Sequence, residues 1–313
     1  MSRYLLRLLA VSVLAGTVAV AQNPQAQIEQ SRQFSAPIGL NVAPQQGVTD
    51  ISAFGSAATP DDAFGAQLIL KEQERPKPFS AFAEIAGFVT NNVALVSRGE
   101  QDDQFLVASA GAAFSHRLAF NLRFDAGARA SLYRYSEFNA LDFQSIDVSG
   151  GITWSPPQLK GTEVLLRYTF TDLTTADGGD EFYKNHAILL GLQKIYPLAR
   201  AHAIYGGISA QWSFADPEES GRDEYVAFLG YRVQATRKIE ADLFYRYGYY
   251  DYRESELDRR DHNQTLSLTI RYAPVEWVSL SATSFAGINR SNEEAFDYDV
   301  LNVGLGLQVS MRF

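Results

Sequence analysis

A period-two alternation of apolar and polar residues runs through residues 79–313 and constrains the fold more than any other feature. From Phe120 to Leu132 every second residue is apolar, and the residues between them are polar, charged or glycine. The same pattern recurs in residues 145–154, 163–171 and 265–272. A period of two is that of a β-strand with one apolar and one polar face. The pattern therefore predicts an all-β fold.

Twelve segments carry this alternation: 79–91, 104–116, 119–135, 143–155, 161–173, 184–196, 200–213, 223–236, 238–251, 262–273, 276–289 and 298–313. Most are long enough to cross a tilted bilayer, which takes about 9–11 residues. Short connections alternate with longer polar ones, as in barrels of bacterial outer membranes. We therefore predict a twelve-stranded antiparallel transmembrane β-barrel over residues 79–313, with a mobile N-terminal segment before it.

Charged residues fall on one face of these segments. The middle of each face assigned to lipid carries no charge, which fits the cost of about 2–4 kcal/mol for a basic residue at the bilayer midplane. The opposite faces supply the predicted pore lining: Arg123, Asp125, Arg129, Asp147, Arg167, Arg232, Glu240, Asp242, Arg246 and Arg271. Two interpretations stay open. These charges select solutes in a channel, or acids and arginines neutralise one another inside a filled lumen.

The last segment alternates up to the C-terminus, with Leu305, Leu307, Val309, Met311 and Phe313 on one face. A final strand of this kind resembles the assembly signal of the bacterial outer-membrane β-barrel (porin-like) superfamily. Gln308 stands where that signal usually has glycine, and Met311 where it favours an aromatic residue. The resemblance implies that Met311 and Phe313 are read by the barrel assembly machinery. It also implies outer-membrane lipid around the barrel.

Residues 1–21 have the features of a secretory signal peptide. Arg3 and Arg7 precede an apolar run, and Ala19-Val20-Ala21 forms a cleavage site. Residues 22–78 are expected to be a periplasmic N-terminal segment. Its first part, to about residue 62, is expected to have no regular structure. Its apolar island, residues 63–71, is a candidate plug, docking segment or short strand. The chain contains no cysteine, which excludes disulfides.

No catalytic motif is present, and the four histidines lack metal-ligand spacing, so we expect no enzyme activity, cofactor or metal. A net charge of −9 without a basic patch argues against a nucleic-acid partner. The leading hypothesis is a passive porin-like channel for small hydrophilic solutes. The alternatives are a structural or assembly-partner barrel with a filled lumen and a surface lipid hydrolase, for which Ser284 is the outward-facing candidate. The expected location is the outer membrane of a Gram-negative-type bacterium, with a periplasmic N-terminus.

Overall fold

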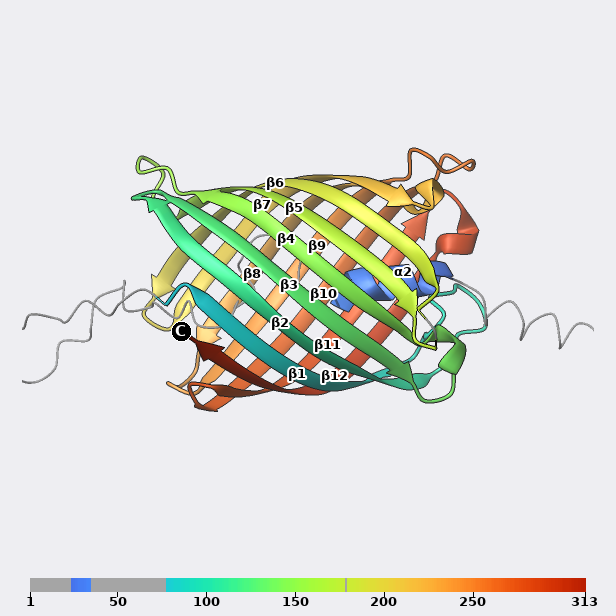
Figure 1. Cartoon of the computed structure of the whole chain (residues 1–313), viewed down its shortest axis with the longest axis horizontal. Coiled ribbons are helices and arrows are strands. Elements are labelled where there is room, and N and C mark those ends of the chain that lie inside the picture. The colour runs from blue at the N-terminus through green and yellow to red at the C-terminus, as the bar shows by residue number, and fades with distance from the viewer. Residues whose placement is uncertain (1–23, 35–76, 178) are drawn as a thin grey trace, which may run out of the picture.

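The computed structural model describes residues 24–34, 77–177 and 179–313. Its main element is one closed antiparallel barrel, in which each strand pairs with its neighbours in the sequence and β1 pairs with β12 (Figure 1). The twelve strands are β1 (Phe79–Thr90), β2 (Asp103–Ala119), β3 (Leu122–Tyr135), β4 (Phe143–Trp154), β5 (Thr162–Thr175), β6 (Glu181–Ala199), β7 (His202–Asp216), β8 (Asp223–Gln234), β9 (Ile239–Asp251), β10 (Arg260–Val275), β11 (Val278–Ser291) and β12 (Tyr298–Arg312).

The predicted barrel is confirmed, strand by strand. Each of the twelve segments forms one strand, and the ends differ from the prediction by three residues at most, as at Glu181 of β6. The alternation locates the strands well because every strand has one face on the surrounding phase and one on the interior. On β10, for example, Leu266, Leu268, Ile270 and Tyr272 are 42–49% exposed on the outer surface.

The two ends of the strand region close the ring. β1 and β12 pair continuously, from Ser80 opposite Arg312 to Thr90 opposite Asn302. Beyond this ladder the backbone amides and carbonyls of Phe79 and Phe313 exchange two hydrogen bonds of 3.1 and 3.0 Å. Phe313 is 64% exposed, in line with its expected place on the outward face.

The two ends of the barrel differ in the length of the connections between strands. Long connections gather at one end and contain three short 3-10 helices: η4 (Asn139–Leu141), η5 (Glu218–Ser220) and η6 (Glu294–Phe296). The other end has short turns, and Phe79 and Phe313 lie there. We call these the long-loop end and the short-turn end.

One α-helix, α2 (Pro24–Phe34), lies inside the long-loop end (Figure 1). Residues 24–34, which belong to the expected N-terminal segment 22–78, thus form a helix at the barrel end opposite Phe79 (Figure 1). The signal peptide and the island at 63–71 lie outside the described residues. Among the described residues, no helix combines the length and the apolar character that crossing a membrane requires.

Candidate functional site: the barrel lumen and its helix

The inner wall over β3, β4 and β5 holds four of the predicted pore-lining charges in hydrogen bonds. Arg123 Nε donates to both carboxylate oxygens of Asp125, at 3.1 and 2.9 Å. Arg129 donates to the hydroxyls of Ser131 and Ser109 at 3.1 and 3.0 Å. Asp147 accepts hydrogen bonds of 2.8 and 2.7 Å from two hydroxyls, those of Ser145 and Thr171. Arg167 lies on β5, with its Cα beside Gly151.

The opposite wall, over β8, β9 and β10, holds the rest of the predicted set. Arg232 Nε lies 2.9 Å from an Asp242 carboxylate oxygen and 3.8 Å from Glu240. Arg271 lies 3.7 Å from that same Glu240 carboxylate. Arg246 pairs with Glu224 of β8 at 2.9 Å. Acids and arginines thus sit beside one another on this wall, as the neutralised-lumen interpretation expects.

Aromatic side chains also face inward, which the sequence analysis did not expect of the lumen. They rest on glycines of neighbouring strands, where a Cβ atom would collide with the ring. An added Cβ on Gly230 would lie 2.1 Å from Cζ of Tyr205, and one on Gly207 would lie 2.7 Å from Cζ of Phe228. These rings therefore lie along the wall. Around Leu165 of β5 and Tyr205 of β7, the rings of Phe228 on β8 and Phe244 on β9 complete a cluster.

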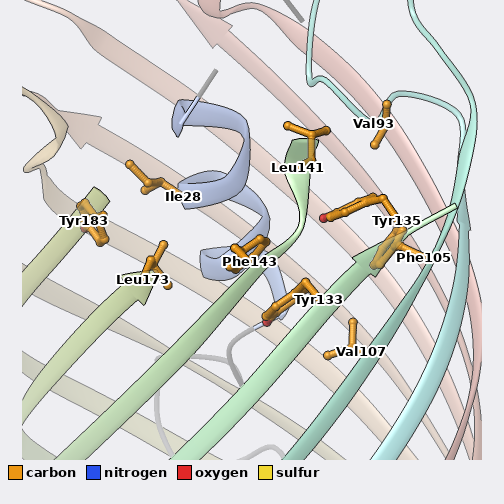
Figure 2. Packing of buried hydrophobic residues seen from close by; sticks show 10 residues of the cluster. All are labelled: Ile28, Val93, Phe105, Val107, Tyr133, Tyr135, Leu141, Phe143, Leu173 and Tyr183. Carbon is orange, nitrogen blue, oxygen red and sulfur yellow. The ribbon is translucent and has the colours of Figure 1, made fainter. Parts of the chain in front are cut away.

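Helix α2 fits into the long-loop end with two apolar contacts. Ile28 is 1% exposed and belongs to a buried cluster with side chains from β2 to β6, including Leu173 and Tyr183 (Figure 2). Phe34 packs its ring 4.9 Å from that of Phe88 and 5.2 Å from that of Phe105. A cavity of only about 20 Å³, roughly the room for one water molecule, separates the helix from the wall here.

Polar contacts hold α2 on all sides. Gln30 donates to the carbonyl of Val93 at 2.6 Å and accepts a hydrogen bond from the Tyr135 hydroxyl. Arg32 donates to the Tyr183 hydroxyl at 2.7 Å and to the carbonyl of Ser220 at 2.8 Å. These partners come from β3, β6 and two long connections, so the helix is surrounded by the barrel.

Glu29 is the most strongly held group of the helix. Nη1 of Arg222 lies 2.7 and 2.9 Å from its two carboxylate oxygens, and the Tyr252 hydroxyl lies 3.0 Å away. Arg32 of the same helix adds a contact of 2.9 Å. Burial opposes ionisation of this carboxyl, but the charges of Arg222, Arg32 and Arg259 outweigh it and lower the pKa of Glu29 to about 2. Glu29 is therefore ionised at neutral pH.

The arginines around Glu29 are stacked on aromatic rings. The guanidinium carbon of Arg222 lies 3.8 Å from the ring centre of Tyr250. That of Arg259 lies between Tyr252, at 4.0 Å, and Phe296, at 3.7 Å. Such cation–π contacts fix the planes of the guanidinium groups. We call the set Arg222, Arg259, Tyr250, Tyr252 and Phe296 the arginine–aromatic cluster.

The sequence analysis missed α2 and this cluster. Residues 24–34 carry only weak helix signals, such as Pro24 at the start and Arg32 in the last turn. The buried run Ala26–Ser31 is mostly polar, so it has no apolar stripe with a helical period. The cluster lies in or beside the long connections, where the period-two alternation does not predict which way a side chain faces. Its members there are Arg222, Tyr252, Arg259 and Phe296.

The outer surface carries three tyrosine–histidine hydrogen bonds. They join Tyr168 to His186, Tyr231 to His202 and Tyr247 to His262, at 2.5–2.7 Å. Ser284 is flanked by Leu268 and Val303, its partners on the neighbouring strands. Within residues 24–34, 77–177 and 179–313, no three acidic or histidine side chains gather in the manner of metal ligands.

Comparisons with known proteins identify the class of fold. No protein-family model matches the sequence, and no curated protein matches it. An outer membrane channel from Pseudomonas putida F1 superposes with a TM-score of 0.55 at 11% identity, covering 76% of this chain and 97% of the other. The outer membrane channel DcaP of Acinetobacter baumannii gives 0.43 at 10% identity, covering 74% and 96%. An anion-selective porin from Comamonas acidovorans gives 0.41 at 9% identity, covering 74% and 98%. Together with the closed twelve-stranded ring, the first likeness confirms the resemblance stated from the sequence: this chain has the fold of an outer-membrane β-barrel.

Proposed function

We propose that the protein is a channel for small hydrophilic solutes in the outer membrane of a Gram-negative-type bacterium, with its short turns in the periplasm. Helix α2, when docked, closes its outer mouth. The observation that carries the proposal is the charged inner wall beneath this helix. Arg123, Asp125 and Arg232 keep side-chain exposures of 18–32% although they face the interior. A wall of partly exposed charges suits the passage of polar solutes.

The contacts of α2 favour a plug that can be released. A permanent filling would be expected to use a continuous apolar interface, because apolar burial is the dominant stabilising term in protein cores. Here Ile28 and Phe34 supply the apolar contacts, and Glu29, Gln30 and Arg32 supply polar ones. We therefore assign two states to the channel, one with the helix docked and one with it released.

The pairing of lumen charges favours weak ion selectivity. Arg123 with Asp125 and Arg232 with Asp242 place opposite charges within 2.9 Å of each other. At that spacing the field of each pair falls off quickly along the lumen. We expect a modest preference between cations and anions in the open channel.

Single-channel conductance in planar bilayers tests the proposal. The full chain should give low or intermittent conductance, and deletion of residues 24–34 should give a steady open channel. The control variant is Glu294→Gln, which changes an exposed ion pair with Arg98 on the outside of the same end. A deletion variant that folds, by its heat-modifiable migration on gels, and yet never conducts would refute the channel.

The second candidate is a scaffold barrel with a filled lumen that binds an envelope partner. The cluster of Leu165 and Tyr205, 1% and 4% exposed, favours it because these side chains fill part of the lumen. The discriminating outcome is loss of partner co-purification on deletion of residues 22–75 from a barrel that never conducts. A surface lipid hydrolase has no such observation in its favour. Recognition of Met311 and Phe313 by the barrel assembly machinery stays a prediction, testable by export of a chain that lacks Phe313.

A further inference from the structure

The barrel holds Arg222 in place without help from the helix. Its Nε atom lies 2.9 Å from Glu224, at the start of β8, and its guanidinium stacks on Tyr250 at the end of β9. With the helix docked, the side chain is 3% exposed. Both partners belong to the wall, so these two contacts of Arg222 do not involve α2.

Arg259 is fixed in the same way beside it. Its Nε and Nη2 atoms contact the carboxylate of Asp261 at 3.0 and 2.5 Å, and its plane lies between Tyr252 and Phe296. The Tyr252 hydroxyl is directed at Glu29 and lies 3.0 Å from Nη1 of Arg222. The wall therefore presents a rigid donor set for one carboxylate.

The charges on the wall indicate that this donor set would bind an anion. Around Glu29 the barrel supplies three arginines, Arg222, Arg246 and Arg259, and two carboxylates, Glu224 and Asp261. Three positive charges minus two negative ones leave one positive charge on the barrel, and the helix adds Arg32 beside Glu29. A buried charge that loses its partner is costly. Release of α2 is therefore easiest when another anion takes the place of Glu29.

We propose that the arginine–aromatic cluster is a binding site for the carboxylate group of a small organic solute, and that Glu29 occupies it as an internal substitute. A solute carboxylate and the helix then compete for Arg222 and Tyr252, so that the solute favours the released state. This inference rests on the proposed function for its role in transport, but binding itself can be measured without any conductance.

The test uses the full chain with Glu29→Ala, which empties the carboxylate position and leaves the wall unchanged. Sodium acetate is the probe. Acetamide, its neutral analogue, and sodium chloride at equal ionic strength are the comparisons. We expect saturable acetate binding by isothermal titration calorimetry, a rise in the unfolding temperature with acetate alone, and binding about tenfold or more weaker in the unchanged chain, where Glu29 competes.

Matched variants locate the site. Adding Arg222→Gln to Glu29→Ala should abolish acetate binding, whereas adding Arg290→Gln should not. Arg290 carries the same charge and pairs with Asp299 at 2.8 Å on the exposed outer face. Should the Arg222 variant fail to fold, Tyr252→Phe removes only the hydroxyl and should weaken binding severalfold.

Three results would overturn the proposal: equal responses to acetate and acetamide, acetate binding that survives both the Arg222 and the Tyr252 changes, or equally tight binding to the unchanged chain. A barrel that binds acetate but never conducts would count against the channel alone. A conducting barrel that does not bind acetate would count against this site alone.

Discussion

Substitution of Glu29 by glutamine should release helix α2 while leaving the barrel intact. The pKa of Glu29 falls from its ordinary value of 4.5 to about 2 in the docked helix. At about 1.4 kcal/mol per pH unit, this difference of 2.5 sets an upper bound of about 3 kcal/mol on the docking free energy at neutral pH, because Arg32 stays with the released helix. The carboxylate is 8% exposed, so solvent screens it little. Glutamine keeps hydrogen bonds to Arg222 and Tyr252, which reduces the expected loss to about 2 kcal/mol.

Cysteine labelling measures this loss directly, because the chain has no cysteine of its own. With the substitution Ala26→Cys, at a position that is 2% exposed, the new thiol should react with a maleimide only when the helix is released. A loss of about 2 kcal/mol should raise the labelling rate about thirtyfold. Glu294→Gln in the same Ala26→Cys background is the control, since it makes the same chemical change in a pair that is 74–84% exposed.

An unchanged labelling rate in the Glu29→Gln chain would refute the reasoning, because it would mean that the buried ion pair does not hold the helix. So would equal increases in the Glu29 and Glu294 variants. Loss of barrel melting cooperativity in the Glu29 variant alone would show that α2 is part of the barrel core rather than a plug.

The same contacts and the glycines of the wall lead to three more expectations. Because the pKa of Glu29 is lower docked than released, its contribution to docking is complete above about pH 4.5 and is lost as the pH falls towards 2. A spin label on the substitution Gln25→Cys should become mobile over that range in the chain that keeps Glu29, and equal pH dependence in the Glu29→Gln chain would contradict this. Ile28→Ala should weaken docking by about 2–3 kcal/mol, seen as faster maleimide labelling of the Ala26→Cys thiol with barrel melting unchanged; labelling at the original rate would argue against the apolar anchor. Gly207→Ala should destabilise the barrel by about 1–3 kcal/mol in urea titrations, because its Cβ would lie 2.3 Å from the Leu192 carbonyl oxygen. Gly150→Ala, which meets no atom within 4 Å, should be neutral, and equal losses in the two would count against the argument.

The strands could be predicted from the sequence because two different environments act on alternate residues. On β10 the outer residues Leu266, Leu268 and Ile270 face one phase, and Ser267 and Thr269 face the other. This contrast repeats along every strand, so even the strand ends followed within a few residues. The alternation also placed the charges of Arg123 and Asp125 inside.

The helix could not be predicted by the same reasoning. A surface helix has an apolar stripe because one side meets a core and the other meets water. Helix α2 has the barrel wall on all sides, and that wall is lined by Tyr135, Tyr183, Arg222 and Tyr252. Its partners are largely polar, so a polar sequence is the complementary one, and such a sequence has the composition of an unstructured segment.

The inward aromatic rings were missed for a different reason. Alternation separates two faces but does not say how a large side chain fits on the inner one. Tyr205 and Phe228 fit because Gly230 and Gly207 leave room beside them on the neighbouring strand. That pairing depends on the register between strands, which a single sequence does not state.

The position of α2 also sets an order of assembly. Its hydrogen-bond partners stand far away in the chain, from 63 residues for Gln30 with Val93 to 265 residues for Gln33 with Tyr298. Contacts over such separations form late, since the entropy of closing the intervening chain must first be offset by other structure. The full set of partners, which includes Tyr298 of β12, is complete only when the last strand has joined the barrel. The segment that is synthesised before the barrel is therefore the last to find its place.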